Sequence, residues 1–158
     1  MQMELCAKEF SELTVEELYE IMKLRVSVFV VEQQCPYMEL DGLDRTALHV
    51  WFRDPEGGLL AYLRVMDRNE SREYVSIGRV IAAKRRCGLG SGILREGIRL
   101  AKERFGAEKI YLEAQCYAKG LYEKQGFVQI SETVLEDGSP HVKMLLDCTE
   151  NDEIMIEK

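Results

Sequence analysis

The stretch that decides the fold of this chain is Val80-Ile81-Ala82 and, one residue later, Lys84-Arg85-Arg86-Cys87-Gly88-Leu89-Gly90-Ser91-Gly92. It predicts a strand, a basic turn and the start of a helix. Gly88 and Gly90 let a phosphate approach the backbone where a side chain would block it. The unpaired amides and the dipole at a helix start favour an anion, and Arg85 and Arg86 add countercharge. The stretch therefore predicts a pyrophosphate site.

Short glycine patterns also occur in plain surface turns with solvated arginines, so the flanking segments decide between the two interpretations. Residues 74–82 become near-continuously apolar, which is typical of a strand buried on both faces. After the turn, apolar side chains follow at helical spacing: Ile93, Leu94, Ile98, Leu100, Ala101 and Phe105. These flanks favour the phosphate site. A dinucleotide fingerprint does not fit, because Ile93 stands in place of its third glycine, and the full P-loop pattern is missing.

Length and composition indicate one soluble domain. The chain has 158 residues, of which 46% are hydrophobic and 31% are charged, and this balance suits a single globular core. Its apolar runs are too short to cross a bilayer, and residues 1–5 lack the pattern of a secretory signal. We therefore expect a cytoplasmic protein with no membrane partner.

Charge and cysteine content exclude further classes of partner and bound group. A net charge of −7 repels phosphate backbones, so we expect no nucleic-acid partner. The five cysteines are widely spaced without a C-x-x-C pattern, which favours reduced thiols outside a secretory context. The two histidines, His49 and His141, form no metal-ligand spacing with them. We therefore expect no metal site.

The sequence patterns predict strands at residues 3–10, 47–53, 59–66, 74–82, 109–114, 127–135 and 141–146. Helices are expected at 14–24, where Thr14 and Glu17 form a capping box, at 93–105 and at 118–124. Residues 25–33 should continue the first helix or form another, although their four β-branched valines favour a strand. This order indicates a mixed α/β (α+β) single domain over residues 1–148. The acidic tail at 149–158 is expected to be frayed.

Several separated motifs carry a family resemblance. Arg85, Gly88 and Gly90 match R/Q-x-x-G-x-G/A, and the turn resembles the acetyl-CoA-binding signature of the GNAT N-acetyltransferases. Residues 114–115 and 121–127 resemble the family's FYxxxGF region, and residues 29–37, 41–44, 77–80 and 136–141 are similar to its ElaA-like branch. The resemblance covers roughly residues 13 to 145. It implies a GNAT-like single domain with a central mixed, mostly antiparallel sheet of about seven strands and about four helices.

The resemblance implies an acyltransferase that moves an acetyl group from acetyl-CoA to a primary amine by direct attack in a ternary complex. It implies backbone contacts to the cofactor from Val80, Ile81 and Ala82. It also implies that Tyr122 contacts the cofactor and acts as the general acid that protonates the departing thiolate. A phenol with a pKa of about 10 suits that task, and a plain packing role is the alternative. Further cofactor contacts are expected along the turn: Arg85, Arg86, Cys87, Gly88, Leu89, Gly90, Ser91 and Gly92.

The general base has six candidates by residue type: Glu32, Asp41, Asp44, His49, Glu113 and His141. Two of them are nominated. Glu32 lies on the helical segment that resembles the acceptor-side wall, although a solvated helix face explains it equally well. His141 is nominated because histidine is the residue type whose ordinary pKa suits a base at neutral pH, although a lone histidine more often has a structural role. A water chain ending at any of the six is a further hypothesis.

Two other functional classes stay open. Arg25, Phe29, Asp41, Asp44 and Arg64 resemble the spacing in acyl-homoserine-lactone synthases, which share this architecture but take acyl chains from a carrier protein. A non-catalytic CoA-binding module would also keep the glycine turn, although it has no use for a general acid. No motif identifies the acceptor, and the acidic composition favours a cationic amine. Open strand edges favour a homodimer.

Overall fold

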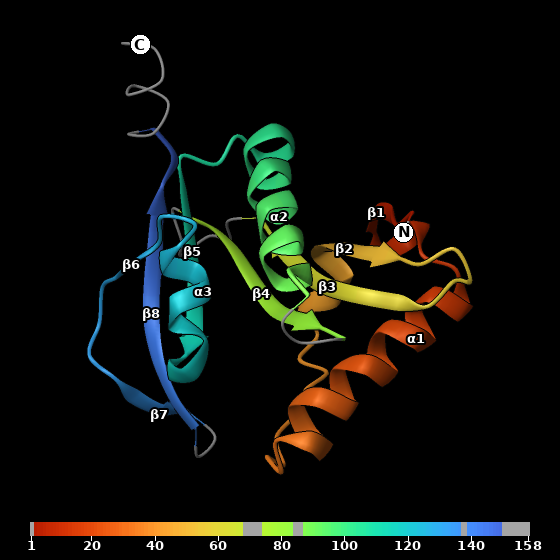
Figure 1. Cartoon of the computed structure of the whole chain (residues 1–158), viewed down its shortest axis with the longest axis horizontal. Helices are drawn as coiled ribbons and strands as arrows, with labels where there is room; N and C mark the ends of the chain where they lie inside the picture. The colour runs from red at the N-terminus through yellow and green to blue at the C-terminus, as the bar shows by residue number, and fades with distance from the viewer. Residues whose placement is uncertain (1, 68–73, 84–86, 137–138, 150–158) are drawn as a thin grey trace.

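One central sheet organises the computed structural model (Figure 1). The structure describes residues 2–67, 74–83, 87–136 and 139–149. Within them the strands lie in the order β1 (Glu4–Glu9), β2 (Ala47–Arg53), β3 (Leu59–Met66), β4 (Val75–Ala82), β5 (Lys109–Gln115), β8 (Ser139–Asp147) and β6 (Val128–Gln129), and β7 (Val134–Glu136) pairs with β8. All pairs are antiparallel except β4 with β5. The mixed, mostly antiparallel sheet predicted from the sequence is confirmed, with eight described strands where roughly seven were expected.

Three α-helices lie in the described residues: α1 (Val15–Val26), α2 (Leu89–Phe105) and α3 (Lys119–Glu123). The capping box of α1 is confirmed, because the Glu17 amide donates to Thr14 Oγ1 at 3.0 Å and the Thr14 amide donates to Glu17 Oε1 at 2.9 Å. The helix continues as a π-helical segment, Ser27–Glu32. The helical prediction for residues 25–33 is therefore correct in spite of their valines, and this segment takes the place of the fourth expected helix.

Strand β2 is buried on both faces, because helices pack on each side of the sheet. Leu48, Val50 and Phe52 belong to the larger core cluster, which includes residues of α2, whereas Trp51 packs with Ile21 of α1 in a second cluster. Successive residues of a strand point to opposite faces, so β2 contributes to two cores at once. No helix among the described residues is long and apolar enough to span a membrane.

Strands β4 and β5 pair over a short length and then separate. Their parallel register joins Val75 to Ile110 and Ser76 to Tyr111, and Figure 1 shows the two strands diverging beyond these residues. Strand β5 pairs with β8 along its whole length. The sheet is therefore split into one part that ends at β4 and another that begins at β5.

The single strand predicted at residues 127–135 is wrong, because the chain forms two short strands there, β6 and β7. Between them the Ser131 hydroxyl accepts the Lys143 amide at 2.9 Å, and the Gln129 side chain donates to the Ser131 carbonyl at 2.7 Å. Side chains thus satisfy backbone groups that a continuous strand would pair. Two other predicted features fall partly outside the described residues: positions 137–138 of the turn and 150–158 of the tail.

Candidate functional site

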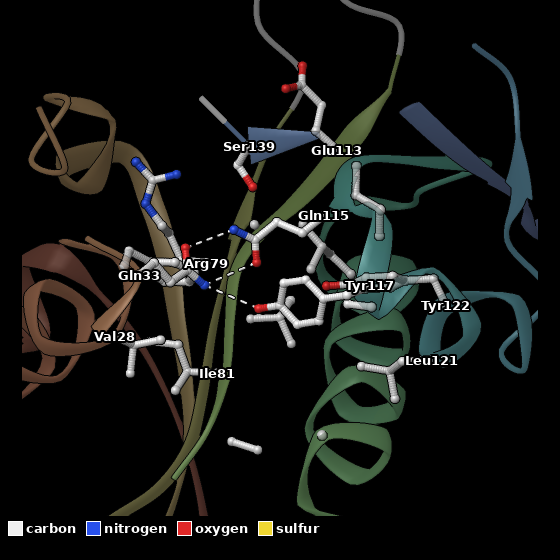
Figure 2. Close-up of a pocket in the computed structure, with 18 of the residues that line it drawn as sticks. Val28, Gln33, Arg79, Ile81, Glu113, Gln115, Tyr117, Leu121, Tyr122 and Ser139 are labelled. Carbon is white, nitrogen blue, oxygen red and sulfur yellow. Dashed lines mark hydrogen bonds between the residues drawn. The ribbon is translucent and has the colours of Figure 1, made fainter. Parts of the chain in front are cut away.

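A cavity of about 900 Å³ lies where β4 and β5 separate. Its lining includes residues 77–82 of β4 and side chains of β5, of α3 and of the short helical turn Cys116–Ala118 between these two elements. The first turn of α2, the π-helical segment and the start of β8 also contribute to it. Figure 2 shows how side chains from these elements converge. The cavity therefore gathers residues from both parts of the split sheet.

The start of α2 brings backbone amides to the cavity. Gly88 is the N-cap with a φ of 74°, and a Cβ there would meet nothing within 4 Å, so its positive φ is what favours glycine. The Gly92 amide makes the first intrahelical bond, to the Gly88 carbonyl. The amides of Leu89, Gly90 and Ser91 consequently have no intrahelical acceptor. Gly88 and these three residues line the cavity, and the first turn has no acidic side chain. This end of the cavity suits an anionic group.

The other residues of the predicted cofactor turn are placed differently. Arg85 and Arg86 lie outside the described residues. Cys87 is exposed, and neither Cys87 nor Gly92 belongs to the described lining of the cavity. Gly92 faces β2, where a Cβ would stand 3.4 Å from Cε2 of Phe52. Close helix–sheet packing therefore accounts for this glycine, and the cofactor contacts of all four residues stay predictions.

The residues predicted as backbone contacts, Val80, Ile81 and Ala82, line the cavity from β4. Because β5 has separated by this point, they have no partner residue on β5. A strand edge of this kind offers hydrogen bonds to an extended ligand that carries amides. Directly before it, Arg79 has a φ of 55°, and the register between β3 and β4 shifts. The edge thus begins at a β-bulge.

Tyr122 of α3 lies in the cavity wall with 8% of its surface exposed. Its ring meets Phe127 edge-on, with 6.0 Å between the ring centroids. Burial, and to a smaller extent the neighbouring Tyr117, raises the pKa of the Tyr122 phenol above its ordinary value. The hydroxyl therefore keeps its proton throughout the physiological pH range. A packing role and a proton-donor role are compatible at this position.

Two glutamines join the walls of the cavity (Figure 2). Gln115 Nε2 donates to Gln33 Oε1 at 2.8 Å, while Gln33 Nε2 donates to Gln115 Oε1 at 3.2 Å and to the Tyr117 hydroxyl at 3.1 Å. Figure 2 shows this Gln33–Gln115 pair between Ser139 on one side and Leu121 on the other. Both glutamines lie in stretches that carry the family resemblance. No site role was predicted for them, because a neutral amide signals neither proton transfer nor metal binding.

Both nominated bases line the cavity. The Nδ1 atom of His141 lies 2.8 Å from the Ser139 carbonyl oxygen. A carbonyl only accepts, so Nδ1 carries the proton of the neutral ring and Nε2 keeps a lone pair. Glu32 ends the π-helical segment and is exposed. Glu113 also lines the cavity, and its Oε1 accepts from the Tyr111 hydroxyl at 3.0 Å.

Asp41 and Asp44 belong to an ionic network and not to the cavity lining. The network joins three arginines to three carboxylates: Arg25, Arg64, Arg79, Glu39, Asp41 and Asp44. Asp44 Oδ1 lies 2.5 Å from Arg25 and 2.9 Å from Arg64. Burial by itself would raise the pKa of Asp41, but hydrogen bonds from Arg64 and a backbone amide outweigh it and lower the pKa to about 2. Both aspartates are therefore ion partners.

His49 is buried beside the ionic network. Its Nδ1 lies 2.7 Å from the Tyr62 hydroxyl and its Nε2 lies 2.9 Å from the Asp44 carbonyl oxygen. Burial lowers the pKa of His49 and outweighs the carbonyl contact, so the ring is neutral at physiological pH. Of the six base candidates, the described cavity lining therefore includes Glu32, Glu113 and His141.

A model of the acetyltransferase (GNAT) domain family matches residues 6–148. A UPF0039 protein of Schizosaccharomyces pombe is 40% identical over 148 residues, which cover 92% of this chain and 97% of that protein. The crystal structure of Escherichia coli ElaA has a TM-score of 0.86 and 34% identity, and covers 92% of this chain and 100% of its own. The crystal structure of an acyl-CoA N-acyltransferase from Pseudomonas aeruginosa has a TM-score of 0.85 and 38% identity, and the match covers 92% of this chain and 99% of that chain.

A CoA-dependent acyl-homoserine lactone synthase has a TM-score of 0.75 at 12% identity, with 92% of this chain and 83% of that chain covered. This likeness extends to the fold alone. The family model and the relatives, in contrast, match nearly the whole chain in sequence. The chain therefore belongs to the GNAT acetyltransferase domain family, in the group that includes ElaA and the UPF0039 proteins.

Proposed function

We propose that this protein transfers an acetyl group from acetyl-CoA to a primary amine by direct attack in a ternary complex. The amine nitrogen forms a bond to the acetyl carbon, and the carbon–sulfur bond of the thioester breaks. The nitrogen loses a proton and the sulfur gains one, so the step is balanced. Membership of the GNAT family supports transferase chemistry, while the acetyl donor and the amine acceptor belong to the proposal.

The observation that carries the proposal is the cavity between the separated strands, with the start of α2 in its lining. In this proposal the amides of Leu89, Gly90 and Ser91 bind the phosphates of CoA. The amide-containing arm follows the edge of β4 at Val80 and Ile81. When bound, acetyl-CoA supplies the activated acetyl group. The residues fit this ligand, because the first turn of α2 is open at Gly88 and free of acidic side chains.

Three groups of the protein would then act on the reacting atoms. Tyr122 holds a proton for the departing sulfur, and the burial that raises its pKa also disfavours a free thiolate beside it. Backbone amides at the edge of β4 stabilise the charge that develops on the carbonyl oxygen. His141 is the favoured proton acceptor for the amine, because the hydrogen bond at its Nδ1 leaves Nε2 with a lone pair. Glu32 is the second choice.

The test is thiol release from acetyl-CoA across a panel of primary amines, with mass spectrometry of each product. We expect release that depends on the amine, together with a product heavier by one acetyl group. Reactions without amine control for hydrolysis of the thioester. Tight CoA binding with no acetylated product across the panel would overturn the proposal and favour a non-catalytic CoA-binding module.

An acyl-homoserine-lactone-synthase-like activity is the second candidate. It is favoured by the fold and by the ionic network, which brings together Arg25, Asp41, Asp44 and Arg64. These side chains bind one another outside the cavity lining, which argues against a substrate role. Lactone release from an acyl carrier protein and S-adenosylmethionine, without thermal stabilisation by acetyl-CoA, would establish this candidate.

A further inference from the structure

Arg79 joins the cavity to the ionic network. It lines the cavity, yet Figure 2 shows its guanidinium pointing away from the Gln33–Gln115 pair. We propose that the ionic network, acting through Arg79, holds the β4 bulge in the shape that positions the thioester. Arg79, Glu39 and Asp41 are then positioning residues. This inference rests on the proposed acetyl transfer and assigns a task to charged groups that the transfer itself does not use.

The backbone at Arg79 has a conformation that its residue type disfavours. Its φ of 55° lies in the left-handed region, where a Cβ comes too close to the following carbonyl oxygen. In the β3–β4 register, Arg79 and Val80 together oppose Leu63. A bulge of this kind re-aims the backbone groups around it. Glycine adopts such a φ freely, so an arginine here requires surroundings that hold it in place.

Those surroundings are visible around the guanidinium of Arg79. Its Nε lies 2.5 Å from Glu39 Oε1, and its Nη2 donates to the Glu39 carbonyl at 3.2 Å and to Asp41 Oδ2 at 3.4 Å. The rings of Tyr37 and Phe29 have their centroids 5.8 Å and 6.0 Å from its central carbon, within the range of cation–π attraction. The side chain is therefore held by two carboxylates, one carbonyl and two rings.

The carboxylates that hold Arg79 are themselves held. Glu39 lies 2.5 Å from Arg25, and Asp41 lies 2.6 Å from Arg64. Both of these arginines are buried, and Glu39 is buried with them. Movement of Arg79 would take from Glu39, a buried carboxylate, one of its two arginine partners, which is unfavourable. The buried arginines thus fix the two carboxylates, and the carboxylates fix the guanidinium of Arg79. In this proposal the fixed guanidinium keeps the backbone of the bulge in place.

The position of the bulge predicts different effects on CoA binding and on acetyl transfer. In the proposed function the β4 edge stabilises charge on the thioester carbonyl, whereas most of the affinity for CoA comes from its phosphates at the start of α2 and a smaller share from its arm at Val80 and Ile81. Loss of the left-handed conformation at Arg79 should therefore lower kcat and leave the affinity for CoA nearly unchanged. A purely structural role would instead lower the amount of folded protein and affect both quantities together.

Replacement of Arg79 by Ala and by Gly tests this directly. Both changes remove the guanidinium, but Gly alone adopts the left-handed region without strain. We expect Arg79→Ala to lower kcat about tenfold or more, and Arg79→Gly to keep kcat within about threefold of wild type. Calorimetric affinity for CoA should stay within about threefold in both variants. Arg53 on β2 is the matched control, because it also lies at a register shift but does not have a positive φ. Arg53→Ala and Arg53→Gly should therefore show no advantage for Gly.

Equal loss of kcat in Arg79→Ala and Arg79→Gly would overturn the inference, because the guanidinium and not the backbone would then be what matters. Wild-type kcat in Arg79→Ala would overturn it as well. If Arg79→Ala does not fold, Asp41→Asn provides the second route. Its loss of kcat should be recovered when Arg79→Gly is added, and failure of that recovery counts against the inference.

The proposed function is checked separately by the wild-type protein. If wild type acetylates no amine, the proposed function fails, and the ratio of acetyl-CoA affinity to CoA affinity still tests the bulge without turnover. That ratio should fall in Arg79→Ala and return to the wild-type value in Arg79→Gly. An unchanged ratio in Arg79→Ala would contradict the positioning role.

Discussion

Gln33 and Gln115, which are 82 residues apart in the chain, exchange hydrogen bonds through their side-chain amides across the cavity. Gln33 follows the π-helical segment and Gln115 ends β5, so the pair connects the helical wall of the cavity to the part of the sheet that begins at β5. Each amide oxygen retains acceptor capacity toward a ligand. The pair therefore stabilises the shape of the cavity and presents polar atoms to its interior.

We expect the two glutamines to be energetically coupled. A double-mutant cycle of Gln33→Ala and Gln115→Ala, measured by urea unfolding, should give a coupling free energy of about 1–3 kcal/mol, the net worth of two hydrogen bonds. Tyr117→Phe should lower the free energy of unfolding by less than either glutamine variant does, because it removes only the hydrogen bond from Gln33 to the Tyr117 hydroxyl. Gln129→Ala combined with Gln33→Ala is the control and should be additive. Additivity of Gln33→Ala and Gln115→Ala would contradict a stabilising pair.

Tyr122→Phe should lower kcat about 100-fold, the lower range for loss of a general acid. CoA affinity should stay within about twofold of wild type, since the ring still packs on Phe127. Because the phenol pKa is raised, initial rates of wild type should show no fall from phenol ionisation up to a pH of about 10. Tyr74→Phe, which stacks on Tyr111, is the matched control. Unchanged turnover of Tyr122→Phe at all pH values would remove Tyr122 from its proposed role.

Local patterns in the sequence were sufficient to predict most of the elements. The capping box of Thr14 and Glu17 lies within four consecutive residues, and the apolar spacing of α2 repeats over its length, so both could be identified without tertiary information. The break between β6 and β7 could not, because it depends on Ser131 accepting from Lys143 of another strand. The strand propensity of a segment is a property of that segment alone, whereas this hydrogen bond joins two segments that are distant in the sequence.

Motifs in the sequence point to two features that line the cavity, residues 88–91 of the glycine turn and Tyr122. Their functional roles stay predictions, and features that depend on long-range geometry have no such motif. Asp41 and His49 have the chemistry of a base, but only the fold shows them engaged with Arg64 and Tyr62 instead. The positive φ of Arg79 has no signal in the sequence, because arginine ordinarily avoids that conformation.

Arg25→Met should be strongly destabilising. Arg25 is fully buried and pairs with Glu39 and Asp44, each at 2.5 Å. Removal of one partner of a buried pair leaves uncompensated charge, so we expect a loss of about 3–5 kcal/mol in the free energy of unfolding. The exposed ion pair of Arg53 with Glu4 provides the control, and Arg53→Met should cost less than about 1 kcal/mol. Similar losses in the free energy of unfolding for Arg25→Met and Arg53→Met would show that the ion pairs of Arg25 contribute no more than an exposed ion pair does.

The ionic network should also determine how the protein responds to acid. Burial would raise the pKa values of Asp41 and Asp44, but hydrogen bonds and charge from the arginines lower both, that of Asp41 to about 2. An unfolded aspartate titrates at about 3.9, so below that pH the unfolded chain binds more protons than the folded one. The stability that these carboxylates contribute is therefore fully present above a pH of about 4 and is lost as the pH falls toward about 2.

Urea unfolding at a series of pH values tests this dependence. Wild type should lose free energy of unfolding steeply below a pH of about 4, and Asp41→Asn should begin less stable and lose less, because it has one such carboxylate fewer. Glu20→Gln, an exposed position on α1, removes the same charge outside the network and should follow the wild-type curve. A curve for Asp41→Asn that runs parallel to wild type through the acid range would mean that Asp41 is not held in its charged form by Arg64.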